Sequence, residues 1–214
     1  MNIQQNKTSN KYIRISRELR DIIHGYIMSD GQVTPSGSVR IDQSIKQRLF
    51  VEWLYEKLQI LRTNTPIRNR IYINKRSRKK SYSMQFQTRS ICKGFRNIWY
   101  KPLAKRKRLP SSIDCFFSIP FVTLWFAGDG TKMIGQRGAQ FEVTCFTPEE
   151  RLKLKQLFKT KFNINAKILR ARKSKTGTYQ WTLSICAPEY DKFRTLITQM
   201  DLIPRIFPYK LCKK

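Results

Sequence analysis

The chain has 214 residues, 43 of them lysine or arginine and 14 aspartate or glutamate, so its formal net charge is +29 at pH 7. Such an excess of one sign destabilises a compact fold by self-repulsion unless a polyanion balances it, which favours nucleic acid as the partner. An anionic membrane surface is the second candidate partner, but no basic amphipathic helix stands out and no apolar run approaches the roughly 20 residues of a membrane span, so we expect no membrane partner. A single histidine without any Cys-x-x-Cys pair argues against a zinc site.

The first 16 residues are polar and basic and contain no acidic side chain. A weak transit peptide is one interpretation of this segment; a flexible arm over residues 1–16 that touches phosphate is the preferred one. The five cysteines are scattered and odd in number, which indicates reduced, mostly buried thiols in an intracellular compartment.

A helix is predicted from about residue 17, because Ser16 is a suitable N-cap and apolar side chains follow at helical spacing. Gly31 is expected to end this helix in the left-handed conformation, which places Asp30 in the last turn. A carboxylate there faces the negative end of the helix dipole and costs a few tenths of a kcal/mol up to about 1 kcal/mol. His24 is interpreted as a surface or interface residue of the same helix.

Strands and helices alternate through the rest of the first half. A hairpin is predicted around Pro35-Ser36-Gly37, and a helix over 44–61. Two strands, near 71–73 and 82–86, flank a basic turn, and a short helix follows at 91–100. The helix over 44–61 is expected to bury a face made of Ile45, Leu49, Leu54, Leu58 and Leu61.

The second half repeats this order. Residues 118–126 predict a helix that is apolar on most sides, followed by Asp129 and Gly130 in the places of Asp30 and Gly31. The two aspartates lie 99 positions apart, and later elements keep nearly the same offset. This internal repeat predicts an α+β fold made of two α-β-β-α-β-β-α units, residues 17–110 and 111–214, related by a pseudo-twofold axis.

The two Asp-Gly helix ends are expected to meet. Gly25 and Ser29 on one helix and Gly128 on the other are small enough for the helices to pack closely, so two carboxylates and two helix C-termini converge. Such a concentration of negative charge indicates a site for divalent cations, which would neutralise it. Mg²⁺ prefers oxygen ligands of this kind together with phosphate.

Each unit is also expected to present an antiparallel sheet, and the two sheets together form a saddle. Where apolar side chains alternate along a strand, the intervening amides and hydroxyls, such as Gln180, Thr182 and Ser184, face outward, as reading of base edges in a major groove requires. The residues expected to contact DNA are Arg40, Arg70, Lys75, Arg76, Arg78, Lys79, Lys80, Gln85, Gln87, Lys132, Arg137, Gln140, Arg170, Arg172, Lys173, Lys175 and Gln180.

The stretches 23–31 and 122–130 resemble the two LAGLIDADG motifs of single-chain homing endonucleases and their maturase relatives, specifically the monomeric type encoded in organellar rRNA-gene introns. Supporting stretches are Tyr82-Ser83-Met84-Gln85-Phe86, Phe146-Thr147-Pro148-Glu149-Glu150, and Ile203-Pro204 followed by Tyr209-Lys210-Leu211. The copies depart from the usual motif, with bulky Leu124 in place of glycine and His24 and Thr123 in place of alanine.

The resemblance implies a site-specific double-strand DNA endonuclease of intron mobility. Asp30 and Asp129 would hold Mg²⁺ together with the main-chain carbonyls of Ser29 and Gly128, and Lys107 and Lys210 would be the basic residues of the two active sites. Which basic residue near 107 serves the first site is left open. The resemblance further implies cleavage across the minor groove, short 3′ overhangs and an organellar location.

Two other functions remain open. Some members of this family act as RNA maturases that assist group I intron splicing, which would make intron RNA a partner instead of, or besides, double-stranded DNA. A basic ribosome-associated protein is the third hypothesis, against which the repeat and the paired Asp-Gly helix ends count. Retention of both aspartates favours the nuclease.

Overall fold

The computed structural model describes residues 13–100, 107–173, 177 and 179–212. The first half contains α1 (Arg17–Met28), β1 (Gln32–Val33), β2 (Val39–Ser44), α2 (Arg48–Lys57), β3 (Arg68–Ile73), β4 (Lys80–Gln87) and α3 (Lys93–Trp99). The second half contains α4 (Ile119–Asp129), β5 (Gly130–Lys132), β6 (Gly138–Glu142), α5 (Pro148–Phe162), β7 (Lys167–Lys173), β8 (Tyr179–Cys186) and α6 (Ala187–Ile197). A further helix, α7 (Leu202–Ile206), follows near the end.

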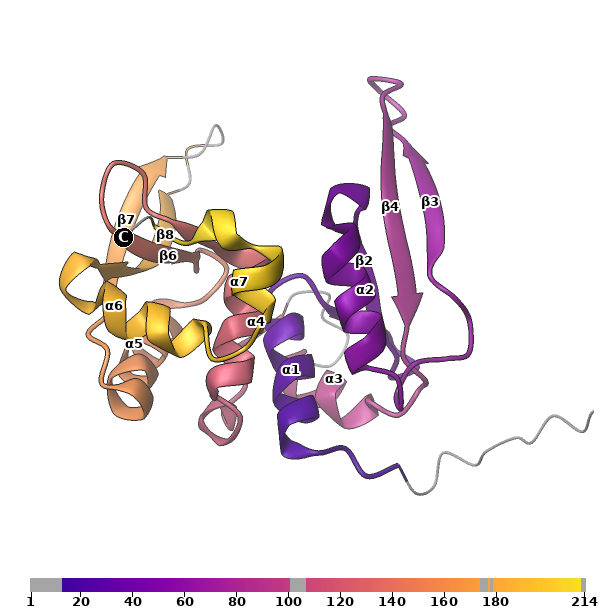
Figure 1. Ribbon diagram of the computed structural model, residues 1–214, viewed down its shortest axis with the longest axis horizontal. Coiled ribbons are helices and arrows are strands. Elements are labelled where there is room, and N and C mark those ends of the chain that lie inside the picture. Colours follow the sequence, from indigo (N-terminus) through magenta and orange to yellow (C-terminus); the bar gives the residue numbers. More distant parts are fainter. Residues whose placement is uncertain (1–12, 101–106, 174–176, 178, 213–214) are drawn as a thin grey trace, which may run out of the picture.

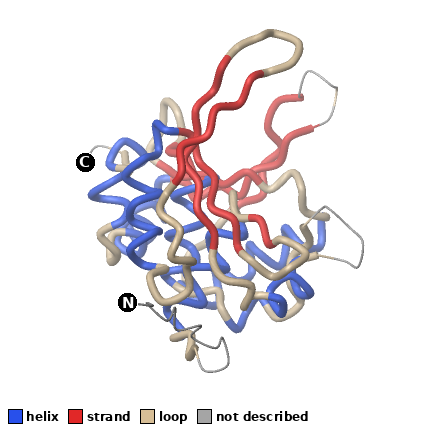
Figure 2. Tube along the Cα trace, turned by 90° about the vertical axis from the view of Figure 1, so that its right-hand side faces the viewer, coloured by secondary structure: helices blue, strands red, loops and turns tan. Residues whose placement is uncertain are grey.

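The predicted α+β tandem repeat is confirmed. Each half builds one four-stranded antiparallel sheet, with strand orders β1-β2-β4-β3 and β5-β6-β8-β7. The two motif helices, α1 and α4, lie side by side in the middle of the molecule (Figure 1). Seen from the side, the strands of both sheets gather on one side and the helices on the other (Figure 2). In the described part of the chain, none of the helices has the length and apolar character needed to cross a membrane.

Capping residues define where several of the helices begin and end. The Ser16 hydroxyl accepts a hydrogen bond from the Leu19 amide (3.1 Å), which caps α1. Thr147 and Glu150 form a capping box at the start of α5, and Asn163 ends that helix in the left-handed conformation. In the β1–β2 hairpin Gly37 has φ +88°, a left-handed conformation that glycine adopts without steric cost because it has no Cβ.

The prediction that Gly31 and Gly130 end their helices in the left-handed conformation is wrong. Among the described residues the glycines with positive φ are Gly37, Gly135 and Gly177, and Gly130 has φ −78° at the start of β5. Glycine is needed at 31 and 130 for space instead. A Cβ at Gly31 would lie 2.7 Å from the Tyr26 ring, and one at Gly130 would overlap the Phe126 ring.

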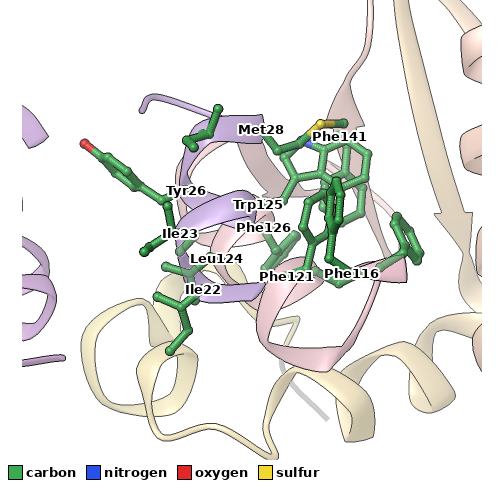
Figure 3. Packing of buried hydrophobic residues seen from close by; sticks show 14 of the residues in the cluster. Ile22, Ile23, Tyr26, Met28, Phe116, Phe121, Leu124, Trp125, Phe126 and Phe141 are labelled. Atoms are coloured by element: carbon green, nitrogen blue, oxygen red, sulfur yellow. The ribbon is translucent and has the colours of Figure 1, made fainter. Parts of the chain in front are cut away.

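One core runs across both halves, and aromatic side chains dominate its second half. The rings of Trp125 and Phe141 lie 4.2 Å apart at their centroids, and Phe158 and Phe193 pack around them. Tyr26 points away from this cluster, to the other side of the paired helices (Figure 3). The aromatic cluster thus joins α4, the second sheet and the helices behind it.

Two predictions about burial are corrected. Ile45 and Leu49 are 45% and 62% exposed, because Ile45 lies in a 3-10 turn before α2 and the buried face of α2 is made of Phe50, Val51, Trp53 and Leu54. The thiols are not mostly buried, since Cys92 is buried but Cys115 and Cys145 are exposed. All five cysteines are free, as expected.

Candidate active site

The paired motif helices approach each other through complementary side chains at equivalent positions. A Cβ at Gly25 would lie 2.9 Å from the Leu124 Cβ and 2.9 Å from the Phe121 Cα, so bulky Leu124 fits against a glycine of the opposite helix. At the next turn the sizes are reversed, because a Cβ at Gly128 would lie 2.5 Å from the Ser29 Cβ. The predicted close packing is therefore present, and it brings the two helix C-termini together.

The two motif aspartates converge at these helix ends. A Cβ at Gly128 would lie 3.0 Å from Asp30 Oδ2, so the Asp30 carboxylate rests against the end of α4. Asp129 is the last residue of α4, whereas Asp30 lies two positions beyond the end of α1 and not in its last turn, contrary to the prediction, because the helix already ends at Met28. Burial, and next the Asp30 charge, raise the pKa of Asp129 to about 7.

The two lysines that the resemblance suggested cap the two motif helices. Lys210 Nζ donates to the carbonyl oxygens of Ala127 and Gly130 (both 2.7 Å), and also to those of Phe126 and Gly128 (3.1 and 3.2 Å). Lys107 Nζ donates to the carbonyls of Ile27 and Ser29 (both 2.6 Å). Each ammonium group thus satisfies carbonyls left open at a helix C-terminus and offsets the helix dipole.

Both ammonium groups are held in a partly desolvated place. Burial lowers the pKa of Lys210 to about 8, although Asp129 and Asp30 act in the opposite sense. The pKa of Lys107 is also lowered by burial, again against the attraction of the two carboxylates. The site therefore contains two carboxylates, the buried ammonium group of Lys210 and the half-buried one of Lys107.

The donors present fit a Mg²⁺ ion. Asp30 and Asp129 supply carboxylate oxygens, and the raised pKa of Asp129 reflects a desolvated negative spot that a divalent cation would stabilise. The carbonyls of Ser29 and Gly128 each accept from a lysine, but a carbonyl oxygen has two lone pairs and can still bind a cation. In the described ranges no cluster of three or more His, Cys, Asp or Glu occurs, and Mg²⁺ needs only one or two carboxylates when phosphate and water complete its shell.

Gln43 is a residue of this site that the sequence reasoning missed. Its Nε2 donates to Asp30 Oδ2 (2.9 Å) and lies 3.4 Å from the Tyr26 hydroxyl. The signal was available, because Gln43 follows Val39 and Ile41 on the side of β2 that faces the helices. A glutamine in that apolar series has to find a polar partner.

Predicted DNA contacts in the first half fall largely on the uncovered face of the sheet. Residues directly opposite each other in an antiparallel pair share a face, and Arg40 lies opposite Gln87 while Arg70 lies opposite Ser83. Gln85 is on the same face, opposite Arg68, an arginine that the sequence reasoning left out. A cleft of about 200 Å³ opens on this face, lined by Arg40, Thr63, Thr65, Pro66, Arg68, Gln85, Phe86 and Gln87.

The tip of the β3–β4 hairpin carries a basic group. The residues Lys75, Arg76, Arg78 and Lys79 are all exposed there, and Arg78 adopts φ 56° in the turn. Lys80 lies opposite Ile73, which places it on the face that turns toward the helices. The basic tip extends beyond the rest of the first half (Figure 1).

The second sheet is less uniform. Gln140 and Gln180 lie on its uncovered face, whereas Arg170 and Lys132 lie opposite Trp181 and Ala139, on the helix-covered face. Arg137 forms an ion pair with Asp191 of α6. Thr182 and Ser184, expected to be exposed, are buried and share a hydrogen bond of 3.1 Å. The backbone of β7 includes Arg172 and Lys173, and Lys175 lies outside the described residues.

His24 does not lie on the helix surface, which was one of the two settings predicted for it; it packs against Phe116 of the second half, in keeping with the other, an interface. It is buried, its Nδ1 accepts a hydrogen bond from Trp99 Nε1 (2.8 Å), and its ring stacks on Phe116. Burial, with the Arg20 charge acting in the same direction, lowers the pKa of His24 to about 3, so the ring is neutral. It belongs to the core beside α1 and takes no part in the carboxylate cluster.

Comparisons with known proteins agree with this geometry. The model of the LAGLIDADG DNA endonuclease family matches residues 20–193. Among solved structures, the homing endonuclease I-WcaI bound to its DNA recognition sequence is similar over 99% of this chain and 96% of that chain, with a TM-score of 0.76 and 16% identity. Full-length DUF199/WhiA from Thermatoga maritima is similar over 95% of this chain and 64% of that chain, with a TM-score of 0.51 and 18% identity. None of the curated proteins matches the chain.

Proposed function

The chain belongs to the LAGLIDADG DNA endonuclease family and is accordingly a DNA-cleaving hydrolase, and from that premise we propose that it is a monomeric, Mg²⁺-dependent homing endonuclease. It cuts both strands of one long duplex site and so supports the mobility of a group I intron in an organellar rRNA gene. The location in an organelle and the intron host are part of the proposal.

The observation that carries this proposal is the meeting of Asp30 and Asp129 at two helix ends that lie between two uncovered sheet faces. Gly25 and Gly128 permit the approach, and burial, with the Asp30 charge as the second cause, raises the pKa of Asp129. The partly buried Asp129 carboxylate is stabilised by positive charge nearby, which Lys107 and Lys210 supply in part and a bound cation would complete. A phosphate backbone with its counter-cation is the partner that fits both the carboxylates and the net charge of +29.

The carboxylates, the lysines and the sheet faces have separate roles in the proposed reaction. Asp30 and Asp129 would hold the cation with the carbonyls of Ser29 and Gly128. Bound there, Mg²⁺ would activate water and stabilise charge on the scissile phosphate and the leaving oxygen. Lys107 and Lys210 fix the two helix ends and supply positive charge beside the carboxylates. The uncovered faces of the two sheets orient the duplex over this centre.

The binding of DNA should depend steeply on salt. If six to ten phosphates are neutralised, affinity falls by about three to five decades between 50 and 200 mM salt. A nearly flat response would remove double-stranded DNA as the partner.

The test is cleavage of a library of organellar DNA segments that includes intron-free rRNA genes. With Mg²⁺ the protein should cut at one dominant site and leave short 3′ overhangs, and EDTA should stop the reaction. Asp30→Asn and Asp129→Asn should abolish double-strand breaks, while Asp114→Asn, a change at an exposed carboxylate away from the site, should leave them intact. Cleavage that persists in EDTA, or in both variants of the motif aspartates, contradicts the proposal.

The same variants separate the rival functions. An RNA maturase would promote splicing of its intron RNA equally well with Asp30→Asn and Asp129→Asn. A ribosome-associated protein would neither cut DNA nor promote splicing.

A further inference from the structure

The two halves of the active site are not chemically equivalent, although the motif helices occupy equivalent places in the two halves. Position 43 follows Ile41 by two residues on β2, and position 143 follows Phe141 by two residues just after β6. Ile41 pairs with Phe86 and Phe141 pairs with Leu183, so these strands occupy the same place in their sheets. Position 143 is therefore the counterpart of position 43.

In the first half this position carries a hydrogen-bond donor to the motif carboxylate. Gln43 Nε2 donates to Asp30 Oδ2 at 2.9 Å. One oxygen of Asp30 is thereby fixed and the other stays available for a ligand. A metal-binding group whose partner holds its orientation binds and reacts better than one left to rotate.

In the second half the counterpart is Val143, which is fully buried and carries no polar group. The neighbouring carboxylates also differ. Asp42 forms an ion pair with Arg70 at 3.6 Å, whereas its counterpart Glu142 accepts a hydrogen bond from the Thr144 amide and adds negative charge near Asp129. Asp129 thus lacks a counterpart of the Gln43 amide at this position and has a carboxylate close by.

The two lysines also differ in how many N–H donors remain for a ligand, and again the first half has the advantage. Four carbonyl oxygens lie within 3.2 Å of Lys210 Nζ, and an ammonium group has three N–H donors, so all of them are used inside the protein. Lys107 Nζ donates to two carbonyls. Within the described ranges it retains a donor that water or phosphate can accept.

We propose that the half-site of Asp30, Gln43 and Lys107 cleaves its strand faster than the half-site of Asp129 and Lys210, so that a nicked duplex precedes the double-strand break. Gln43 acts as a positioning residue through Asp30. This inference rests on the proposed function and adds the order in which the two strands are cut.

The experiment uses the full chain and a supercoiled plasmid that carries the site recovered from the library. Nicked circles should accumulate before linear product, and a duplex labelled separately on each strand should give two different rate constants. The variant Gln43→Met removes the amide but keeps an unbranched side chain of similar size. It should slow the faster strand by about 10-fold to 100-fold, the usual cost of losing a partner of a metal-binding group, and leave the slower strand unchanged.

The matched control is Gln156→Met, at an exposed position on α5, which should change neither rate. All rates are measured at a temperature where circular dichroism reports every variant folded. Equal rates for the two strands in the wild type overturn the inference, and so does a Gln43→Met variant that slows both strands alike or only the slower one. If the wild type cuts no site at all, the proposed function itself fails, which is a different result from cutting without a nicked intermediate.

Discussion

The two sheets have the same strand order but differ in how far they extend beyond their helices. Every residue of β3 is exposed, and Ile71, Ile73 and Tyr82 share the helix-facing side of the β3–β4 hairpin yet lie in solvent. In the second sheet the corresponding side carries Leu183 and Ile185, which are fully buried. The first sheet therefore reaches outward with arginines on its uncovered face, whereas the second sheet is tied into the aromatic core. We therefore expect recognition to be weighted toward the first half and stability toward the second.

The largest expected effect concerns the lysines that cap the motif helices. Lys210→Met should lower the free energy of unfolding by about 3 kcal/mol, because a buried ammonium group that four carbonyls surround cannot be removed without leaving them unpaired. Lys107→Met, which loses two such bonds, should cost about 2 kcal/mol. Urea unfolding of both variants measures the difference, and a larger loss in Lys107→Met would contradict the comparison.

The glycines between the motif helices give the next effect. Gly25→Ala and Gly128→Ala should each destabilise the protein by about 1–3 kcal/mol through overpacking. Gly25→Ala should cost more, since its Cβ would meet the backbone of α4, whereas at Gly128 it would meet the Ser29 side chain. Cleavage should suffer more in Gly128→Ala, because the same Cβ would crowd Asp30 Oδ2.

Two double variants test whether the overpacking between the motif helices is local. Ser29→Gly should recover part of the stability lost in Gly128→Ala, since the two positions face each other, and should recover nothing in Gly25→Ala. Thermal unfolding and plasmid cleavage are measured on all five proteins. Equal recovery in both backgrounds would show that the loss is not local.

Residues on the uncovered faces of the two sheets should make different kinds of contact with DNA, one with bases and the other with phosphates. Arg68→Ala should cost about 1–3 kcal/mol of discrimination at one base pair of the first half-site. Lys167→Ala, at the exposed start of β7, should weaken binding to all sequences alike and reduce the salt slope by about 1. Cleavage of single-base target variants and binding at several salt concentrations separate the two outcomes.

The stability of the protein should also depend on pH. Because the pKa of Asp129 is raised from 3.8 to about 7, the folded protein binds more protons than the unfolded chain between these values, and stability falls as pH rises through them. Without divalent metal, the wild type should lose stability relative to Asp129→Asn from about pH 4 to pH 7. Urea unfolding in EDTA across this range measures the difference, and a gap that stays constant would refute the assignment.

The sequence predicted the topology well because its signals are local and occur twice. The caps at Ser16 and Thr147, the apolar periods and the small residues of the motif helices need no knowledge of the partner strand. The offset of 99 positions between the two aspartates then relates the halves to each other. The meeting of Asp30 with the end of α4 follows from these features alone.

Other features depend on contacts between segments far apart in the chain. Whether Arg170 or Gln180 faces outward depends on strand register, and a shift of one residue reverses the face; β7 contains such an irregularity between Arg170 and Lys173. Ile45 and Leu49 have helical spacing but are exposed, because Ile45 lies in a 3-10 turn and the buried face of α2 is made of Phe50, Val51, Trp53 and Leu54. The link from Gln43 to Asp30 forms only once β2 folds back beside α1.

The fit of Leu124 into the space left by Gly25 has a further consequence. Two copies of the second half would bring Leu124 against Leu124 at a spacing that fits a glycine. The covalent linkage therefore joins complementary surfaces, and the second half no longer carries a motif helix that can pair closely with its own copy.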